Sequence, residues 1–98
     1  MAYGQSTSPD LDRAMELSNR SIELKPTNAS FYETRGSIRV QRDELDLAVQ
    51  DFEKAMLGMP KSEKLLRELA DVYQALGFET QAEAYRKRLE NLDSSKQP

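Results

Sequence analysis

The sequence contains no cysteine, no histidine and no tryptophan among its 98 residues. Without cysteine and histidine it lacks the usual zinc ligands, a thiolate nucleophile and an imidazole base. No disulfide can form, so cysteine usage does not indicate a redox compartment. We therefore predict no metal site, no cofactor and no catalysis that depends on these side chains.

An excess of positive charge and long apolar runs are also missing. The chain has 14 Lys and Arg against 17 Asp and Glu, a net charge of -3, so it lacks the surplus that neutralises a phosphate backbone. Its apolar clusters, such as Leu65-Leu66, are far shorter than the roughly 20 residues of a membrane span. The N-terminus lacks the basic stretch followed by an apolar one that indicates a signal peptide. We expect no nucleic-acid partner, no membrane span and, by default, a cytoplasmic location.

The residues that are abundant favour helices. Ala, Leu, Glu, Lys, Arg, Gln and Met supply more than half of the chain, whereas the strand-favouring Val, Ile and Thr are few. Only 38% of the residues are hydrophobic, which is little for one compact core at this length. The composition therefore predicts an all-α protein, either stacked as a layer or part of something longer.

Two prolines, Pro26 and Pro60, end helical segments and lie 34 residues apart. Each is followed two positions later by a good N-cap residue, Asn28 or Ser62. Gly77 is suited to a left-handed helix end. The predicted helices cover residues 9–24, 28–42, 45–58, 62–76 and 79–92. The loops between them are short, so neighbouring helices should run antiparallel.

The proline spacing is also the period of an internal repeat. With a shift of 34 residues, Ala14, Ala48 and Ala82 superimpose. Gly36 and Ala70 align on the first helix of each pair, opposite Ala48 and Ala82 on the second. Small side chains at both places would let two antiparallel helices approach closely. The repeat therefore predicts helical hairpins that stack on one another.

In this register the sequence resembles the tetratricopeptide repeat (TPR) family. The positions that match one unit are Tyr32, Gly36, Ala48, Phe52, Ala55 and Pro60, and those that match the next are Leu66, Leu69, Ala70, Tyr73, Gly77 and Ala82. The preceding unit matches only through Ala14 and Pro26. The resemblance implies an α-α superhelix, or solenoid, of about two and a half repeats. Phe52 would fill the gap between successive hairpins.

The repeat register divides the chain into domains and ends. We predict a TPR-like domain over residues 8–93, made of a half repeat (8–28) and two repeats (29–62 and 63–93). Residues 1–7 are predicted to be the remnant of a truncated first helix or disordered, and residues 94–98 a disordered tail. The chain would then be a C-terminal fragment of a longer TPR protein. The side chains left partly uncovered by the missing helix would be Leu11, Met15, Leu17 and Ile22.

Three arginines depart from the family pattern. Arg35 and Arg39 stand where the family has Leu and Tyr, so the 28–42 helix should bury less apolar surface. Arg86 replaces the aromatic residue that Phe52 supplies one unit earlier, and an unpaired guanidinium is costly to bury. We therefore expect the 79–92 helix to cap the array. Its solvated outer face would carry Glu83, Arg86, Lys87 and Glu90.

Catalysis is the alternative to a binding role, but the chain offers only carboxylates, lysines and tyrosines for acid–base chemistry. The acidic residues dense enough to consider are Asp43, Glu44, Asp46, Asp51 and Glu53. Acids are favoured in the first turn of a helix, so we interpret them as helix-start acids and a solvated helix face. The aromatic residues fall mostly at repeat-core positions, although Tyr73 and Tyr85 could send a hydroxyl to the surface. We predict that the protein is not an enzyme.

The resemblance implies a concave face, lined by the first helix of each hairpin, that holds extended or helical peptides. The inward positions of the 28–42 helix are Ser30, Glu33, Ser37, Val40 and Gln41. Those of the 62–76 helix are Lys64, Arg67, Asp71, Gln74 and Ala75. One TPR subfamily grips a peptide's terminal carboxylate with Lys and Asn, but Glu33 and Ser37 occupy those places, so we expect no such clamp.

Two interpretations of this surface stay open. Lys64 and Arg67 could meet an acidic partner segment. Alternatively, the face is an ordinary solvated surface with intrahelical pairs such as Glu63–Arg67 and Lys64–Glu68. The groove is also short against the roughly 800 Å² per partner of a stable interface, so affinity should be weak.

We therefore predict a non-catalytic protein–protein interaction or scaffold module that binds a peptide or partner protein on its concave face. One alternative is a self-association module that forms a homodimer through its N-terminal helix face. Another is an accessory domain of a larger enzyme.

Overall fold

The computed structural model describes residues 9–95 and contains five α-helices, with no strand in that range. The helices are α1 (Pro9–Leu24), α2 (Ala29–Gln41), α3 (Leu45–Gly58), α4 (Glu63–Ala75) and α5 (Glu79–Ser95). All five predicted helices are confirmed. The predicted remnant at residues 1–7 lies outside the described residues, as do residues 96–98, and α5 includes the first two residues of the predicted tail.

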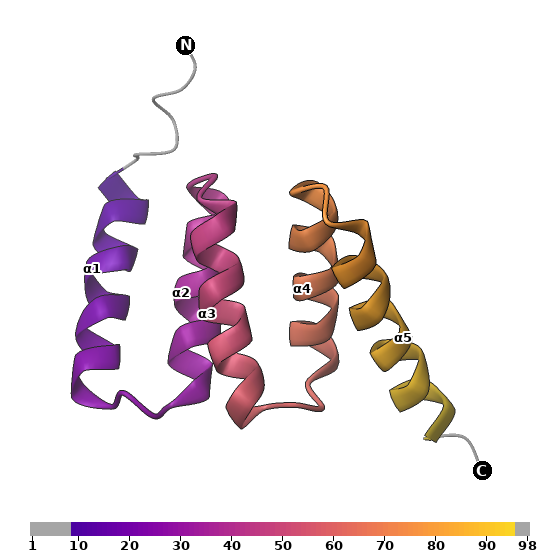
Figure 1. The fold of residues 1–98 in the computed structure, drawn as a ribbon. Helices are drawn as coiled ribbons and strands as arrows, with labels where there is room; N and C mark the ends of the chain where they lie inside the picture. The colour runs from indigo at the N-terminus through magenta and orange to yellow at the C-terminus, as the bar shows by residue number, and fades with distance from the viewer. Residues whose placement is uncertain (1–8, 96–98) are drawn as a thin grey trace.

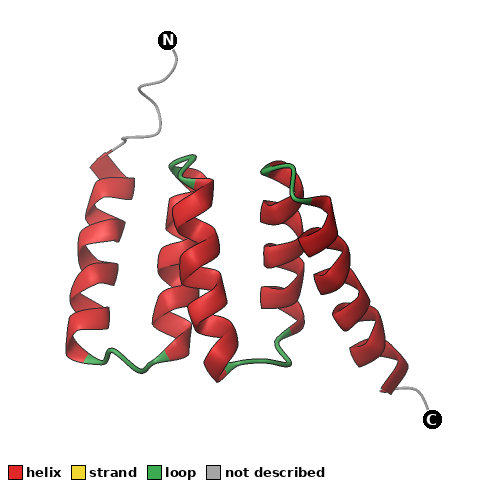
Figure 2. Ribbon diagram, in the orientation of Figure 1, coloured by secondary structure: helices red, strands yellow, loops and turns green. Residues whose placement is uncertain are grey.

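The helices form a flattened stack rather than a globule. Short turns join them alternately at the two ends of the stack, so that consecutive helices run antiparallel (Figures 1 and 2). The closest partners are α2 with α3 and α4 with α5, while α1 packs on α2 and α3 on α4. The principal extents are 47 × 34 × 19 Å. This arrangement is the predicted stack of helical hairpins.

The helix boundaries follow from local chemistry. The side-chain oxygen of Asn28 accepts a hydrogen bond from the Ser30 amide at 3.0 Å, and that of Ser62 accepts one from the Leu65 amide at 3.1 Å. Both caps satisfy amides that have no partner within the helix. Gly77, with a φ of 88°, follows α4 in the left-handed region that a residue without Cβ adopts at no steric cost. The predicted caps and the glycine stop are therefore confirmed.

The core lies where small residues let the helices approach. Ala48 and Ala82 are fully buried, whereas Ala14, the first of the series, is only half-buried. A Cβ at Gly36 would lie 2.6 Å from the ring of Phe52, so only glycine lets α2 come this close to α3. The largest fully buried side chains are Phe52, Leu65, Leu66 and Leu69. Phe52 thus joins α3 to both neighbouring helices, as its place in the repeat predicts.

Asp51 corrects the interpretation of the α3 acids as a solvated face. Asp51 is only 3% exposed. Its two carboxylate oxygens accept from Arg35 Nε and Nη2, both at 2.9 Å, and Oδ2 also accepts from Arg39 Nη1 at 3.0 Å. Hydrogen bonding and charge attraction to Asp51 raise the pKa of Arg35. The two arginines that depart from the family pattern therefore replace apolar packing between α2 and α3 with a shared ion pair.

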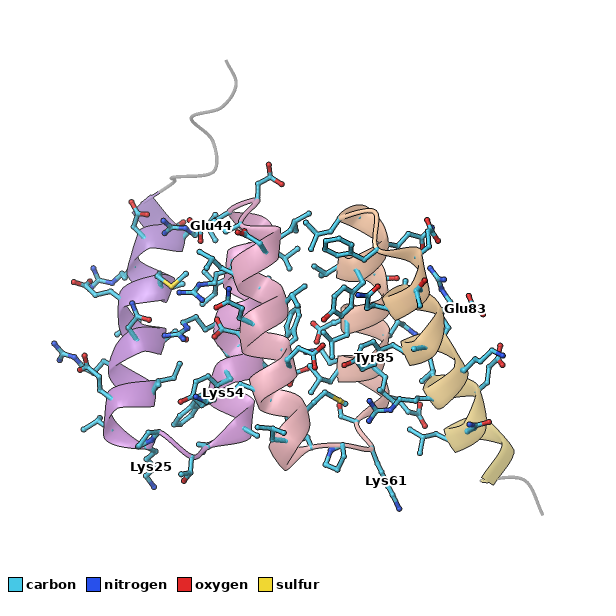
Figure 3. All side chains as sticks on the ribbon, viewed as in Figure 1. Lys25, Glu44, Lys54, Lys61, Glu83 and Tyr85 are labelled. Atoms are coloured by element: carbon cyan, nitrogen blue, oxygen red, sulfur yellow. The ribbon has the colours of Figure 1, made fainter. Side chains whose placement is uncertain are left out.

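Glu53 is the second correction on the same helix. Its carboxylate accepts hydrogen bonds from the hydroxyls of Tyr73 at 2.6 Å and Tyr85 at 2.8 Å. The two rings stack, with centroids 5.8 Å apart, and Tyr85 lies on the inner side of α5 (Figure 3). Burial, and then the Glu53 carboxylate, raise the pKa of Tyr85 to about 12. Both tyrosines thus lie at core positions, as expected, and their hydroxyls tie α4 and α5 to α3 instead of reaching the surface.

The outer face of α5 agrees with its prediction at three of four positions. Glu83, Lys87 and Glu90 are exposed. Arg86 is only half-exposed, because it reaches back to the side-chain oxygen of Gln74 on α4 while pairing with Glu83 at 3.3 Å. Arg86 therefore contributes to hairpin packing as well as to the surface.

Candidate functional site

A hollow of about 290 Å³ lies between α2 and α4, above α3. We call it the α2–α4 groove; its lining consists of Ser37, Val40, Gln41, Phe52, Glu68, Asp71 and Val72. Ser37, Val40, Gln41 and Asp71 were predicted from the sequence, and the structure brings these four together. Phe52 and Val72 were missed because they are core residues that lie beneath the groove. Glu68 was interpreted only as a helix-surface partner of Lys64.

The other predicted site residues are not part of the groove lining. Glu33 and Lys64 are next to it, with a carboxylate oxygen 3.4 Å from the ammonium nitrogen. Ser30 belongs to the start of α2, where its hydroxyl donates to Asn28 at 2.7 Å. Gln74 accepts from Arg86, and Arg67 and Ala75 are exposed on α4. The helix pair Lys64–Glu68 forms with a 3.9 Å separation.

The carboxyl groups of Glu33 on α2 and Glu68 on α4 lie next to each other. Ser37 donates its hydroxyl to Glu68 Oε2 at 3.2 Å, which joins α2 to α4. Glu68 Oε1 is buried and accepts no hydrogen bond from the described residues, while the buried Glu33 Oε2 has the Lys64 ammonium as its neighbour. Burial, and then the neighbouring Glu33 carboxyl, raise the pKa of Glu68 to about 7, although Lys64 opposes the shift. The groove therefore contains a carboxyl group that ionises near neutral pH.

The raised pKa predicts a pH dependence of stability. The folded chain binds a proton at Glu68 more tightly than the unfolded chain, whose ordinary value is 4.5, so stability should fall as the pH rises from about 4.5 through about 7. Glu68→Gln should raise the unfolding free energy at pH 8 by about 1 kcal/mol, a small effect because the site is screened by solvent. At pH 4 the substitution should gain nothing. Urea unfolding of both proteins across this range checks the prediction; an unchanged difference between them would contradict it.

A second hollow, of about 540 Å³, lies against α1 and is lined mainly by charged residues. Its Arg42 already pairs with Asp12 at 2.9 Å. On α1 itself, Leu17 is 60% exposed and Leu24 is 76% exposed. The other residues predicted to be partly uncovered, Leu11, Met15 and Ile22, are half-buried. This surface shares no lining residue with the α2–α4 groove.

Two further features were sought among the described residues, a group of metal-ligating side chains and a helix able to span a membrane. No group of three or more acidic side chains within residues 9–95 is arranged to hold a metal ion. Within the same range no helix combines the length and the apolar character needed to cross a bilayer.

Comparison with known proteins identifies the class of fold. No family model matches the chain. Over 72 residues the chain is 36% identical to mitochondrial import receptor subunit TOM70 of Homo sapiens and 35% identical to the same subunit of Rattus norvegicus. The alignments cover 74% of this chain but 12% of each receptor subunit, so the chain spans a small part of the relatives it matches.

A solved structure agrees with these relatives. The crystal structure of MamA superposes on 90% of this chain and 52% of its own, with a TM-score of 0.83 and 22% sequence identity. With the sequence relatives and the repeated hairpins, this superposition shows that the chain has a TPR-type fold, an all-α solenoid of helical hairpins.

Proposed function

We propose that this chain is a non-catalytic protein-interaction module that holds a segment of a partner protein in the α2–α4 groove. The observation that carries the proposal is the groove itself, which has an apolar base at Phe52 and Val72, with Val40 and polar groups at its rim. A concave surface with few placed polar groups is the usual form of a binding site. The TPR-type fold and the likeness to a mitochondrial import receptor subunit support a partner that is a polypeptide.

The test is selection of random 12-residue peptides on the immobilised chain. Val40→Trp would fill the groove from a rim position that is 37% exposed, so the fold should tolerate it. Leu57→Trp is the matched control, since Leu57 is 83% exposed and does not line the groove. Selected peptides should bind the wild type with micromolar affinity, lose at least tenfold on Val40→Trp and keep their affinity on Leu57→Trp. Peptides that bind both variants like the wild type would refute the groove as the site.

Self-association through α1 is the second candidate function. It is favoured by the exposed side chains of Leu17 and Leu24 on one helix. Sedimentation at decreasing concentration separates the two candidates, because only self-association predicts a dimer that dissociates on dilution. Leu17→Glu should then convert that dimer to a monomer without changing peptide binding.

A further inference from the structure

The α2–α4 groove is acidic because carboxyl groups from both α2 and α4 lie in it or beside it. Neither helix sequence alone indicates this. Among its lining residues the charged ones are Glu68 and Asp71, and no lysine or arginine is included. Glu33, with a side chain only 15% exposed, adds a third carboxylate beside them. Groups on two helices thus place negative charge next to the apolar side chains of Val40 and Val72.

The acidic groups retain unused capacity to accept hydrogen bonds. Glu68 Oε2 accepts from Ser37, whereas Glu68 Oε1 accepts from none of the described residues and Glu33 Oε2 has the Lys64 ammonium 3.4 Å away. Buried acceptors without donors are costly, and a carboxylate that ionises near neutral pH is a strong acceptor. A cationic donor that enters the groove would supply the missing hydrogen bonds and offset the like-charge repulsion.

The cation already present on this surface does not meet that need. Lys64 is 72% exposed and lies 3.4 Å from Glu33 and 3.9 Å from Glu68, so it is held loosely at the rim. Arg67 is exposed on the same helix. An acidic partner segment would have to place its charge next to Glu68 and Asp71 in order to reach the apolar base, and the repulsion opposes this.

We propose that the α2–α4 groove selects partner segments that carry a lysine or arginine beside an aliphatic side chain. The cationic group would donate to Glu68 Oε1, with Glu33 and Asp71 adding attraction. The aliphatic side chain would lie against Val40 and Val72. This inference rests on the proposed function and adds a preference for one kind of peptide. The groove volume of about 290 Å³ accommodates parts of a peptide rather than a drug-sized molecule.

The test uses four 12-residue peptide libraries that differ only in a fixed central pair, Leu-Arg, Leu-Lys, Leu-Gln or Leu-Glu, with all other positions random. Each library is panned against the full chain, against Glu68→Gln and against Glu90→Gln. Glu90 is exposed on α5, outside the groove, so its variant controls for the loss of one negative charge. We expect the two basic libraries to be enriched at least tenfold over Leu-Glu on the wild type and Glu90→Gln, and less than threefold on Glu68→Gln. The enrichment should also be larger at pH 8 than at pH 5.

The possible results separate this inference from the proposed function. Peptides that bind at the groove, as shown by their loss on Val40→Trp, but without a basic preference would overturn the inference and leave the proposed function standing. An acidic preference would overturn it as well. If no library yields a peptide that depends on the groove, the proposed function fails and the inference fails with it.

Discussion

Replacing Phe52 by alanine is expected to lower the free energy of unfolding by about 3–5 kcal/mol. The ring is fully buried and belongs to the cluster that joins α2, α3 and α4. Gly36 brings the α2 backbone against it, so the chain around the ring has little freedom to collapse into the space left behind. The loss should therefore include a cavity cost in addition to the lost burial of the ring.

Urea unfolding followed by circular dichroism measures this loss, and a variant that is unfolded without denaturant agrees with it. Leu57→Ala on the same helix is the control, because Leu57 is 83% exposed and its truncation should cost less than about 0.5 kcal/mol. A Phe52→Ala protein within 1 kcal/mol of the wild type would show that the hairpins are not held together through this ring.

Replacing Asp51 by alanine should cost about 2–4 kcal/mol. Arg35 and Arg39 would each lose a carboxylate partner within 3.0 Å, and their side chains are only 20% and 19% exposed. Their guanidinium groups would be left partly desolvated and mutually repelling between α2 and α3. The cost is below that of a fully buried charge because both arginines still reach some solvent.

The control for Asp51 is Asp46→Ala, which removes an exposed acid from the same helix and should cost less than about 1 kcal/mol. A triple variant, Arg35→Leu, Arg39→Tyr and Asp51→Ala, should recover most of the loss, since apolar residues can replace a buried ion pair at little cost. Equal unfolding midpoints for the wild type and Asp51→Ala would show that the ion pair contributes nothing to the stack.

The helices and their order could be predicted because their signals are local. Prolines and N-caps act within one helix or one turn, and Asn28, Ser62 and Gly77 have the roles that their chemistry predicts. The burial of Ala48 and Ala82 followed from the 34-residue repeat of small side chains.

The polar interior could not be predicted in the same way, since it depends on pairs that are distant in sequence. Arg35 and Arg39 were noticed as departures, but their partner Asp51 lies 16 and 12 residues further along. A search for an acid to compensate two misplaced arginines would have found it. Glu53 offers no comparable signal, because tyrosines at its two partner positions are also compatible with ordinary core packing.

Part of the groove lining could be anticipated. The expected inward positions on α2 and α4 include Ser37, Val40, Gln41 and Asp71, which line one hollow, and binding of a partner there stays a prediction. The role of Glu68 depends on how closely α2 approaches α4, which brings Glu33 and Ser37 next to its carboxyl group. The helical periodicity of α4 alone does not predict how far apart α2 and α4 lie.

The most direct measurement of where a partner binds is an NMR titration of the ¹⁵N-labelled chain with a selected peptide. The proposed function predicts that the largest amide shift changes map to Ser37, Val40, Gln41, Glu68 and Asp71, with little change on the exposed face of α5 at Lys87 and Glu90. Shift changes concentrated on α1 around Leu17, or spread over α5 with the groove unaffected, would contradict it.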